Sequence, residues 1–428
     1  MTPETKQRIE QIHRGEVPEG YKATKIAIFP KEWKTVRLKK QFIRQTRKNT
    51  ERNTNVLTIS AQHGLISQED FFSKSVASEN KENYYLLYRG DFAYNKSYSN
   101  GYSYGAIKTL ELYEKGVVSP LYICFSKTKE NECPEFYTHY FEAGMLNHEI
   151  QALAQEGARN HGLLNISIED FFNAIIVQPP LAEQQRIADI LTTEDKVIEL
   201  KEKRLAEKQQ QKKYLMQQLL TGKKRLPGFS GEWKVNRLHN IVKRYTKRNA
   251  VGNTNVLTIS AQYGLINQSE FFNKAVASDD KSNYFLLEKG DFAYNKSYSN
   301  GYPFGAIKRL TRYDVGIVSP LYICFRIKDG SVSGEYLEQY FEAGLMNHEI
   351  QAFAQEGARN HGLLNIAVDD FFNSKILLPL PEEQATIAEV LSAADCEIDL
   401  LQQDIEQEKQ KKKALMQLLL TGIVRVKV

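Results

Sequence analysis

A repeat with an offset of 200 residues constrains this chain more than any other feature. The letters GDFAYNKSYSNGY occupy residues 90–102 and return unchanged at 290–302. AQEGARNHGLLNI, at 154–166, is also repeated letter for letter at 354–366. Solenoid repeats span only roughly 20–45 residues, so a period of this length excludes that architecture. The 428 residues are therefore predicted to form two copies of one complete module.

The first part of each copy has the pattern of a mixed α/β (α+β) globular domain. Short apolar and aromatic runs such as NVLTIS and GVVSPLYICF alternate with Gly, Asn, Ser and Pro, which is typical of strands and turns. One helix is expected at residues 134–157. We predict an N-terminal polar segment at 1–28 and two globular domains, at 29–180 and at 223–380. These two domains are called the target domains below.

The second part of each copy is predicted to be a long helix, at 181–222 and 381–422, with a tail at 423–428. Prolines stand at the helix starts, and no Gly or Pro interrupts residues 183–221 before Gly222. Apolar residues follow an alternating four-then-three spacing, which indicates a narrow coiled-coil seam. The two helices are expected to pair as an antiparallel coiled coil with pseudo-two-fold symmetry.

Charge and composition narrow the class of protein. The net charge of +5 is mild, but residues 37–52 hold seven Lys or Arg against one acid, and residues 237–248 hold five against none. A solvated face or a phosphate-binding surface would explain these stretches. The four cysteines show no metal-ligand spacing, and the polar N-terminus lacks a secretory or membrane segment. We expect a cytoplasmic protein without a membrane span.

The sequence offers no motif that carries catalysis in its required context. It contains no GxxxxGK[ST], GxGxxG or HExxH pattern. The letters GYSYG at 101–105 have the GxSxG spacing, but no helix start follows them, as a nucleophile elbow would require. His148 and Glu149 are adjacent, and neighbouring helical residues point about 100° apart, so a structural role is favoured over acid-base catalysis. No catalytic residue and no metal site are predicted.

Two repeated polar loops are the candidate DNA contacts. Lys neutralises phosphate, Arg and Asn match the edges of guanine and adenine, and Tyr offers a ring and a hydroxyl. A solvated loop is the alternative for each. The candidates in the first copy are Asn95, Lys96, Ser97, Tyr98, Asn100, Tyr102, Arg159, Asn160 and His161. Those in the second are Asn295, Lys296, Ser297, Tyr298, Asn300, Tyr302, Arg359, Asn360 and His361.

The paired layout resembles the specificity subunit of type I restriction-modification systems. The residues that carry the resemblance are the EW pairs at 32 and 232, PPLAEQQRIADIL, PLPEEQATIAEVL, and the helix ends KKYLMQQLLTG and KKALMQLLLTG. The resemblance covers nearly the whole chain after residue 29.

The resemblance implies a non-catalytic subunit that reads a split site on double-stranded DNA. It implies two methyltransferase and two restriction subunits as partners, which would use S-adenosylmethionine, ATP and magnesium. In that family the helices are spacers that dock the methyltransferase. The docking candidates here are Ile187, Leu191, Leu215, Leu219, Ile387, Leu391, Leu415 and Leu419.

Other interpretations remain open from the sequence. The target-recognition subunit of a type IIB enzyme would have the same layout, and its partner would then carry nuclease and methyltransferase motifs in one chain. A protein-protein adaptor with two domains is a third interpretation. A stand-alone hydrolase or nuclease is disfavoured by the missing motifs.

Overall fold

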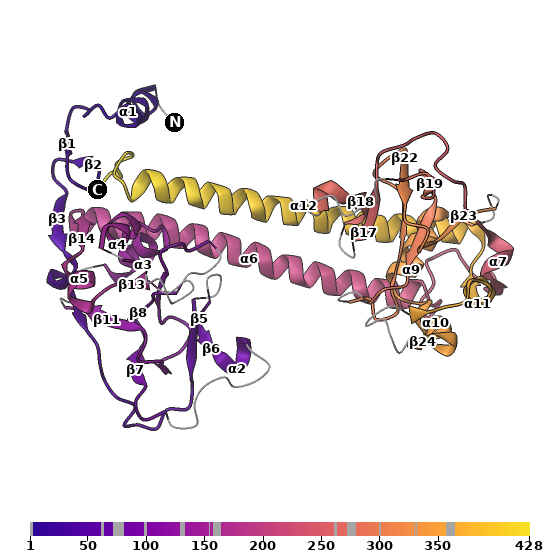
Figure 1. Ribbon diagram of the computed structural model, residues 1–428, viewed down its shortest axis with the longest axis horizontal. Helices are drawn as coiled ribbons and strands as arrows, with labels where there is room; N and C mark the ends of the chain where they lie inside the picture. Colours follow the sequence, from indigo (N-terminus) through magenta and orange to yellow (C-terminus); the bar gives the residue numbers. More distant parts are fainter. Residues whose placement is uncertain are drawn as a thin grey trace. The chain divides into compact units, whose positions relative to one another are not determined.

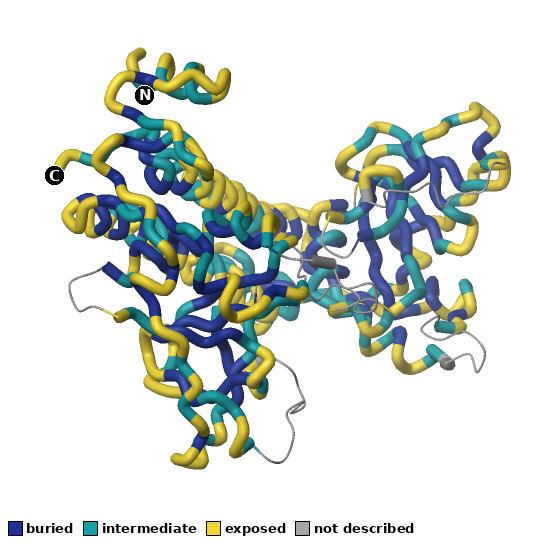
Figure 2. The backbone as a smooth tube through the Cα atoms, turned by 60° about the vertical axis from the view of Figure 1, so that its left-hand side comes forward, coloured by how far each residue is buried: buried dark blue, intermediate teal, exposed yellow. Residues whose placement is uncertain are grey.

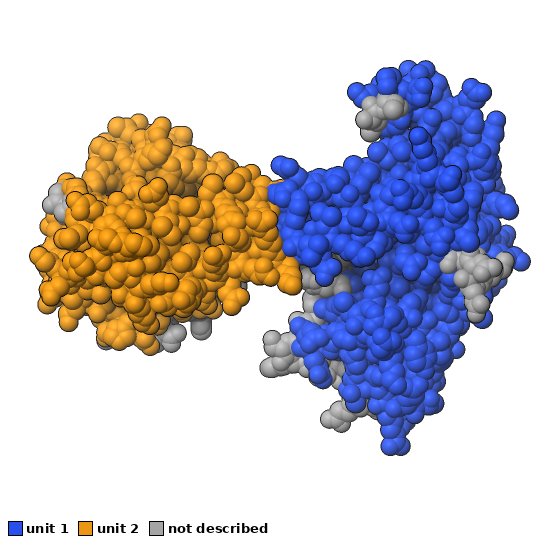
Figure 3. All heavy atoms as spheres, turned by 180° about the vertical axis from the view of Figure 1, so that it is seen from behind, with its two compact units in different colours: residues 1–201, 404–428 blue, residues 202–403 orange. Residues whose placement is uncertain are grey.

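The computed structural model describes most of the chain and divides it into two compact units. The described residues are 3–60, 64–71, 81–97, 101–128, 133–153, 155–156, 164–260, 263–271, 280–298, 301–328, 330, 332–356 and 364–428. Unit 1 comprises residues 1–201 and 404–428, and unit 2 comprises residues 202–403 (Figure 3). Both boundaries fall within the two long helices, so each unit contains one target domain and half of each helix.

The elements of unit 1 follow one another from the N-terminus to the first long helix (Figure 1). They are α1 (Pro3–His13), β1 (Tyr21–Ala23), β2 (Ile28–Pro30), β3 (Lys34–Arg37), η1 (Leu38–Lys40), β4 (Phe42–Arg44), β5 (Leu57–Ser60), β6 (Gly64–Ser67), α2 (Gln68–Phe71), β7 (Tyr85–Tyr88), β8 (Phe92–Asn95), β9 (Ala106–Thr109), β10 (Lys115–Val118), β11 (Ile123–Lys127), α3 (Pro134–Glu142), α4 (Asn147–Leu153), β12 (Gln155–Glu156), β13 (Leu164–Asn165), α5 (Ile168–Asn173), β14 (Ile175–Gln178) and α6 (Leu181–Leu219).

Unit 2 repeats the series from the strand that corresponds to β3. Its elements are β15 (Lys234–Arg237), α7 (Leu238–Ile241), β16 (Val242–Arg244), β17 (Leu257–Ser260), β18 (Gly264–Asn267), α8 (Gln268–Phe271), β19 (Phe285–Glu288), β20 (Phe292–Asn295), β21 (Ala306–Arg309), β22 (Val315–Val318), β23 (Ile323–Ile327), α9 (Gly334–Glu342), α10 (Asn347–Phe353), β24 (Gln355–Glu356), β25 (Leu364–Asn365), α11 (Val368–Asn373), β26 (Lys375–Leu378) and α12 (Pro381–Leu419).

A four-stranded antiparallel sheet is the centre of each domain. Its strand order is β4-β11-β8-β9 in unit 1 and β16-β23-β20-β21 in unit 2. Successive side chains of a strand point to opposite faces, so Phe92 and Tyr94 enter one core while Ala93 enters another. Both faces are covered, which explains why runs such as FAY and ICF are apolar without alternation. The strands of the sheet are mostly buried, whereas α1 is mostly exposed (Figure 2).

Aromatic rings fill the larger core of unit 1. Phe42 lies edge-on to Phe92, Phe125 and Tyr137, with ring centroids 5.1–5.5 Å apart. Edge-to-face pairs of this kind add to the free energy gained by burying the rings. On the other face β10 crosses close to β5: a Cβ on Gly116 would lie 2.5 Å from Leu57, so only glycine fits there.

The prediction of one continuous helix at 134–157 is wrong. The structure has two helices, α3 and α4, followed by strand β12. Gly144 adopts a φ of 68°, and the Met145 N–H donates to the Tyr140 carbonyl, which is the bond of a Schellman helix end. The glycine therefore ends α3 and lets α4 start in a new direction.

Within each unit the long helices run antiparallel, as the sequence predicts (Figure 1). In unit 1 the first half of α6 pairs with the last half of α12, through ion pairs such as Lys412 with Asp195. In unit 2 the last half of α6 pairs with the first half of α12, and Lys212 meets Asp395 in the equivalent pair. The mixed α/β class, the two similar domains and the antiparallel helix pairing are confirmed.

The motifs that carry the family resemblance form a joint at the start of each long helix. The buried Glu183 accepts a hydrogen bond from the Trp33 indole at 3.0 Å and forms an ion pair with Arg425. In unit 2 Glu383 accepts from Trp233 at 3.2 Å and pairs with Arg225 at 2.6 Å. Each joint therefore ties the first strand of a domain, one helix start and the segment that follows the other helix.

Candidate nucleic-acid interface

The first predicted DNA loop leaves the central sheet between β8 and β9. Asn95 pairs with Ala106 at the end of the two strands, and the Tyr94 hydroxyl donates to the Tyr104 carbonyl at 2.8 Å. Gly105 adopts a φ of 74°, and a Cβ there would lie 2.3 Å from the Asn95 carbonyl oxygen. The base of the loop is therefore tightly closed, and glycine is required for that closure.

Asn95 shapes the start of this loop. Its side-chain oxygen accepts a hydrogen bond from the Ser97 N–H at 3.1 Å, and Asn295 accepts from Ser297 at the same distance. This is the geometry of an Asx turn, which sets the direction of the backbone locally. Lys96 lies inside the turn, and among the described residues no carboxylate forms an ion pair with it or with Lys296.

The strands that flank the second predicted loop contact the start of the first. β12 and β13 pair in antiparallel register, and the Leu164 N–H donates to the Lys96 carbonyl at 3.1 Å. In unit 2 the Leu364 N–H donates to the Lys296 carbonyl, also at 3.1 Å. Described residues that flank the two polar loops are therefore in contact, although they are far apart in the sequence.

Several predicted contact residues lie outside the described part of the chain. They are Tyr98, Asn100, Arg159, Asn160 and His161 in the first copy, and Asn300, Arg359, Asn360 and His361 in the second. Tyr298, by contrast, is described, and 62% of its surface is exposed.

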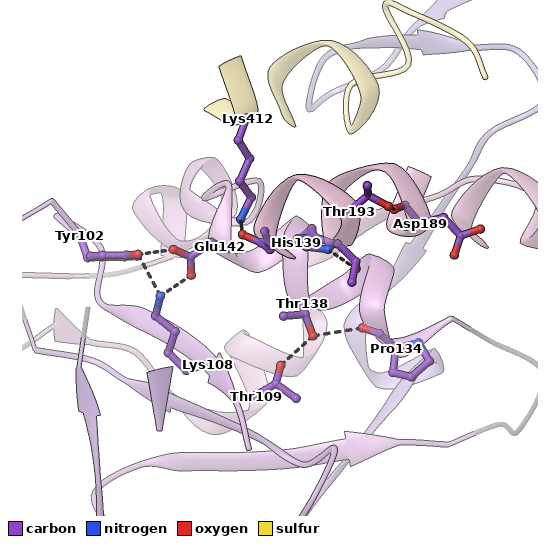
Figure 4. A network of polar contacts seen from close by, with 12 residues as sticks. Tyr102, Lys108, Thr109, Pro134, Thr138, His139, Glu142, Asp189, Thr193 and Lys412 are labelled. Carbon is purple, nitrogen blue, oxygen red and sulfur yellow. Dashed lines mark hydrogen bonds and ion pairs between the residues drawn. The ribbon is translucent and has the colours of Figure 1, made fainter. Parts of the chain in front are cut away.

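Tyr102 has a different environment from the one that the sequence predicts. Its hydroxyl donates to Glu142 at 2.5 Å and accepts from Lys108 at 3.0 Å, and Lys108 and Glu142 form an ion pair (Figure 4). Burial and the Glu142 carboxylate raise the pKa of Tyr102. Tyr302, Lys308 and Glu342 repeat this arrangement in unit 2. We therefore interpret both tyrosines as anchors of the loop rather than as hydroxyl donors to DNA.

The partners of Tyr102 are functional residues that the sequence reasoning missed. The Lys108 side chain is only 8% exposed, although it lies on strand β9. A lysine inside an apolar strand, repeated as Lys308, is the sequence signal that could have identified a buried ion pair.

One arginine of the first basic stretch is used inside the domain. Arg47 pairs with the buried Asp91, whose carboxylate also accepts the Tyr88 N–H at 2.7 Å. In unit 2 position 247 is lysine, and Arg326 from the neighbouring strand pairs with Asp291 at 2.5 Å instead. Residues of the basic stretch therefore form ion pairs within the domain, in addition to any contact with phosphate.

The eight predicted docking residues are in the interior. Ile187, Leu191, Leu219, Ile387, Leu391 and Leu419 are each at most 4% exposed, and Leu215 and Leu415 pack against the same cores. Their side chains attach the helices to the target domains, so most of their surface is covered within the chain. Exposed residues of the helices are therefore further candidates for a docking surface.

Exposed leucines on the helices fit that description better. Leu200 on α6 is 67% exposed, and Leu400, its counterpart on α12, is 60% exposed. The next residue along α6, Lys201, contacts α12 through ion pairs with Asp404 and Glu408.

The adjacent His148 and Glu149 do not form an acid-base pair. Glu149 accepts a hydrogen bond from the Ile175 N–H at 2.8 Å, and Glu349 accepts from the Lys375 N–H at 2.8 Å. Each carboxylate thus holds the first residue of a strand, which is the structural role that the sequence favours. In the part of the chain that the structure describes, no cluster of His, Cys, Asp or Glu could bind a metal ion. None of the described helices combines the length and the hydropathy needed to cross a bilayer.

Comparisons with known proteins show what the chain is similar to. Residues 30–209 match the family described as type I restriction modification DNA specificity domain. The type I restriction enzyme MjaVIII specificity subunit of Methanocaldococcus jannaschii is 26% identical over 301 residues, which are 65% of this chain and 68% of that protein.

Two solved structures share the fold. One comes from work on complex assembly and conformational transition of the type I restriction-modification system, with a TM-score of 0.52 and 17% identity over 92% of this chain and 99% of that one. The other is the S subunit of a type I system from M. genitalium, with a TM-score of 0.50 and 11% identity over 92% and 97% of the two chains. These matches support the resemblance seen in the sequence: residues 30–209 match the specificity-domain family, and the curated relative is named as a specificity subunit of a type I enzyme.

Proposed function

We propose that this chain is the non-catalytic DNA-recognition and scaffold subunit of a type I restriction-modification complex. The observation that supports it best is the contact of Leu164 with Lys96, repeated by Leu364 with Lys296, between residues that flank two polar loops. An enzyme would need convergent reactive groups, whereas the loops offer cations, amides and hydroxyls at the end of a rigid sheet. These are groups that contact phosphates and base edges.

The two domains would read the two halves of one bipartite DNA site. Lys96 and Lys296 would neutralise phosphates and position each domain on the duplex. The neighbouring loop residues, including those outside the described part of the chain, would read the bases. Because the two copies share their loop sequences, the two half-sites are proposed to be nearly the same.

The long helices would hold two methyltransferase subunits, and two restriction subunits would complete the complex in the cytoplasm. S-adenosylmethionine, ATP and magnesium would be used by those partners rather than by this chain. The relatives support this proposal through their family, since they are named as specificity subunits.

The double substitution of Lys96→Ala with Lys296→Ala tests the phosphate contacts. Binding to a duplex that carries the methylated motif would be measured against salt concentration, with and without the methyltransferase subunits. We expect weaker binding and a slope of log affinity against log salt that is smaller by about 2, since each lost phosphate contact removes about 1.

Arg89→Ala with Lys289→Ala is the matched control. These residues precede β8 and β20, so they lie at the other end of the sheet, in exposed ion pairs with Glu114 and Asp314. The control removes the same charge and should leave the salt slope unchanged. Absent or salt-insensitive binding by the wild-type chain in both conditions would instead favour a protein-protein adaptor. A partner with nuclease and methyltransferase motifs in one chain would favour the type IIB interpretation.

A further inference from the structure

The two copies allow a comparison of exposed apolar residues within one chain. Most large apolar side chains exposed on one domain are charged or polar in the other. The pairs are Ile43 and Lys243, Tyr88 and Glu288, Leu112 and Arg312, Thr35 and Val235, and Glu51 and Val251. These exposed positions thus accept both apolar and polar side chains.

Leu121 departs from this pattern. It is 76% exposed, and its counterpart Leu321 is also leucine and 72% exposed. Ile168 is 36% exposed, and its counterpart in the second copy is the half-buried Val368. The counterpart of Tyr298 in the first copy is Tyr98, which lies outside the described residues. Among the described apolar residues of the domains, Leu121 and Leu321 are therefore the identical pair that both copies expose.

A tight turn holds Leu121 outward. The Tyr122 N–H donates to the Ser119 carbonyl at 3.1 Å, and the Leu121 N–H donates to the Ser119 hydroxyl at 3.3 Å. The turn around Leu321 has the same two hydrogen bonds at the same distances. Pro120 precedes the leucine and restricts the backbone further. A turn whose backbone is already fixed loses little backbone entropy when a partner covers it.

The turn lies at the end of the sheet that carries the predicted DNA loop. Ile123 pairs with Tyr94 in antiparallel register, so the residues before β11 and those after β8 leave the sheet at one end. In unit 2 Ile323 pairs with Tyr294, with the same consequence. Leu121 and Lys96 therefore share a sheet end, which we call the loop end. It comprises residues 95–97, 101–105, 119–122 and 164–165, with their counterparts 200 residues later.

We infer that Leu121 and Leu321 are base-contacting residues, each placing an apolar side chain against a base of its half-site. The inference rests on the proposed function, because it takes duplex DNA as the partner. The chemistry suits the position: cations and amides at the loop end contact phosphates and polar base edges, and they leave apolar base surface such as the thymine methyl group without a match. A leucine beside them supplies that match, and identical half-sites would require it in both copies.

The test compares wild type with a variant that carries both Leu121→Ala and Leu321→Ala. Both proteins are used as the full chain, assembled with the methyltransferase subunits. Affinity is measured for a duplex with the methylated motif and for an unrelated duplex of equal length. We expect roughly tenfold weaker binding to the motif for each substituted half-site, since a covered leucine loses most of its apolar contact. Binding to the unrelated duplex and the salt slope should not change, because phosphates dominate both.

Leu112→Ala is the matched control, since Leu112 is 61% exposed and lies between β9 and β10, at the other end of the sheet. It should bind the motif like wild type, and Leu121→Met with Leu321→Met should retain most of the affinity. Equal loss on both duplexes, no loss on either, or loss of methyltransferase assembly would overturn the inference. If wild type binds neither duplex, the proposed function itself fails, which separates the two outcomes.

Discussion

At the scale of single residues, position 139 is a buried site that holds a histidine in one domain and a glutamine in the other. His139 lies on α3, with Nε2 3.1 Å from the Thr192 hydroxyl and Nδ1 3.8 Å from Asp195. In unit 2 Gln339 takes its place and donates to Asp395 at 2.8 Å. Figure 4 shows His139 on the same helix as Glu142, which anchors the DNA loop. One helix therefore carries both the loop anchor and the contact with the long helices.

We predict that His139 makes the chain less stable in acid and that His139→Gln removes this effect. Burial and the Lys412 ammonium lower the pKa of His139 to about 4, although Asp195, Glu142 and Glu135 act in the opposite direction. Between the unfolded value of about 6.5 and pH 4 the unfolded chain binds more protons, so the free energy of unfolding falls as the pH falls. The contribution is complete above pH 6.5 and reaches at most about 3 kcal/mol.

Denaturant unfolding of wild type and His139→Gln at pH 7 and pH 4.5 measures the difference. Other carboxylates titrate in both proteins, so only the change between the two proteins reports on His139. Gln339 shows that glutamine can bond the equivalent aspartate, which makes the variant structurally conservative. An equal loss of stability in both proteins would mean that His139 titrates normally.

The sequence predicts which residues form the polar loop, but it does not predict the ion pair that holds one of them. Asn95, Lys96 and Tyr102 could be grouped because they are neighbours in one polar stretch. The ion pair of Lys108 with Glu142 joins residues 34 positions apart, and it depends on how α3 packs on β9. A local pattern carries no information on such packing, so the inward role of Tyr102 could not be inferred.

At the scale of elements, the long helices show what periodicity does and does not determine. A stretch without Gly or Pro, ended by Gly222, predicts the helix, and the structure has α6 from Leu181 to Leu219. The four-then-three spacing also identifies the buried face. It does not say what covers that face: the target domains cover its ends, while ion pairs such as Lys212 with Asp395 join the helices between them.

We predict that Leu200→Glu with Leu400→Glu weakens assembly with the methyltransferase subunits without unfolding the chain. Glutamate keeps the helix propensity, and both leucines are more than half exposed, so little buried surface is lost. A leucine buried at the centre of an interface is often worth about 2 kcal/mol, so binding should be roughly 30-fold weaker per subunit.

Analytical ultracentrifugation of the mixed subunits measures this assembly. Tyr214→Ala is the control, since Tyr214 is a helix residue with 54% exposure whose counterpart is already Ala414. Wild-type assembly by the double leucine variant would place the docking surface elsewhere on the chain.

At the scale of the whole molecule, the two domains use the helices in exchanged roles. The domain of unit 1 is attached to the start of α6 and the end of α12, and the domain of unit 2 to the start of α12 and the end of α6. The 200-residue repeat predicts the two modules. It does not reveal that each compact unit contains half of the long helix that belongs, by sequence, to the other repeat. That exchange follows from antiparallel pairing, which is a long-range property of the chain.

The exchange of roles leads to a prediction about the DNA site. The sequence predicts a pseudo-two-fold pairing of the two copies, and two-fold symmetric proteins match inverted operator halves. We therefore predict a methylated motif with two inverted, nearly identical halves about one helical turn apart. Sequencing of methylated genomic DNA from cells that carry the system reads the motif directly. Inverted halves that differ at one base would point to differences between the loops, such as Ser103 against Pro303. Direct repeats would contradict the prediction, because a two-fold axis relates two half-sites by inversion.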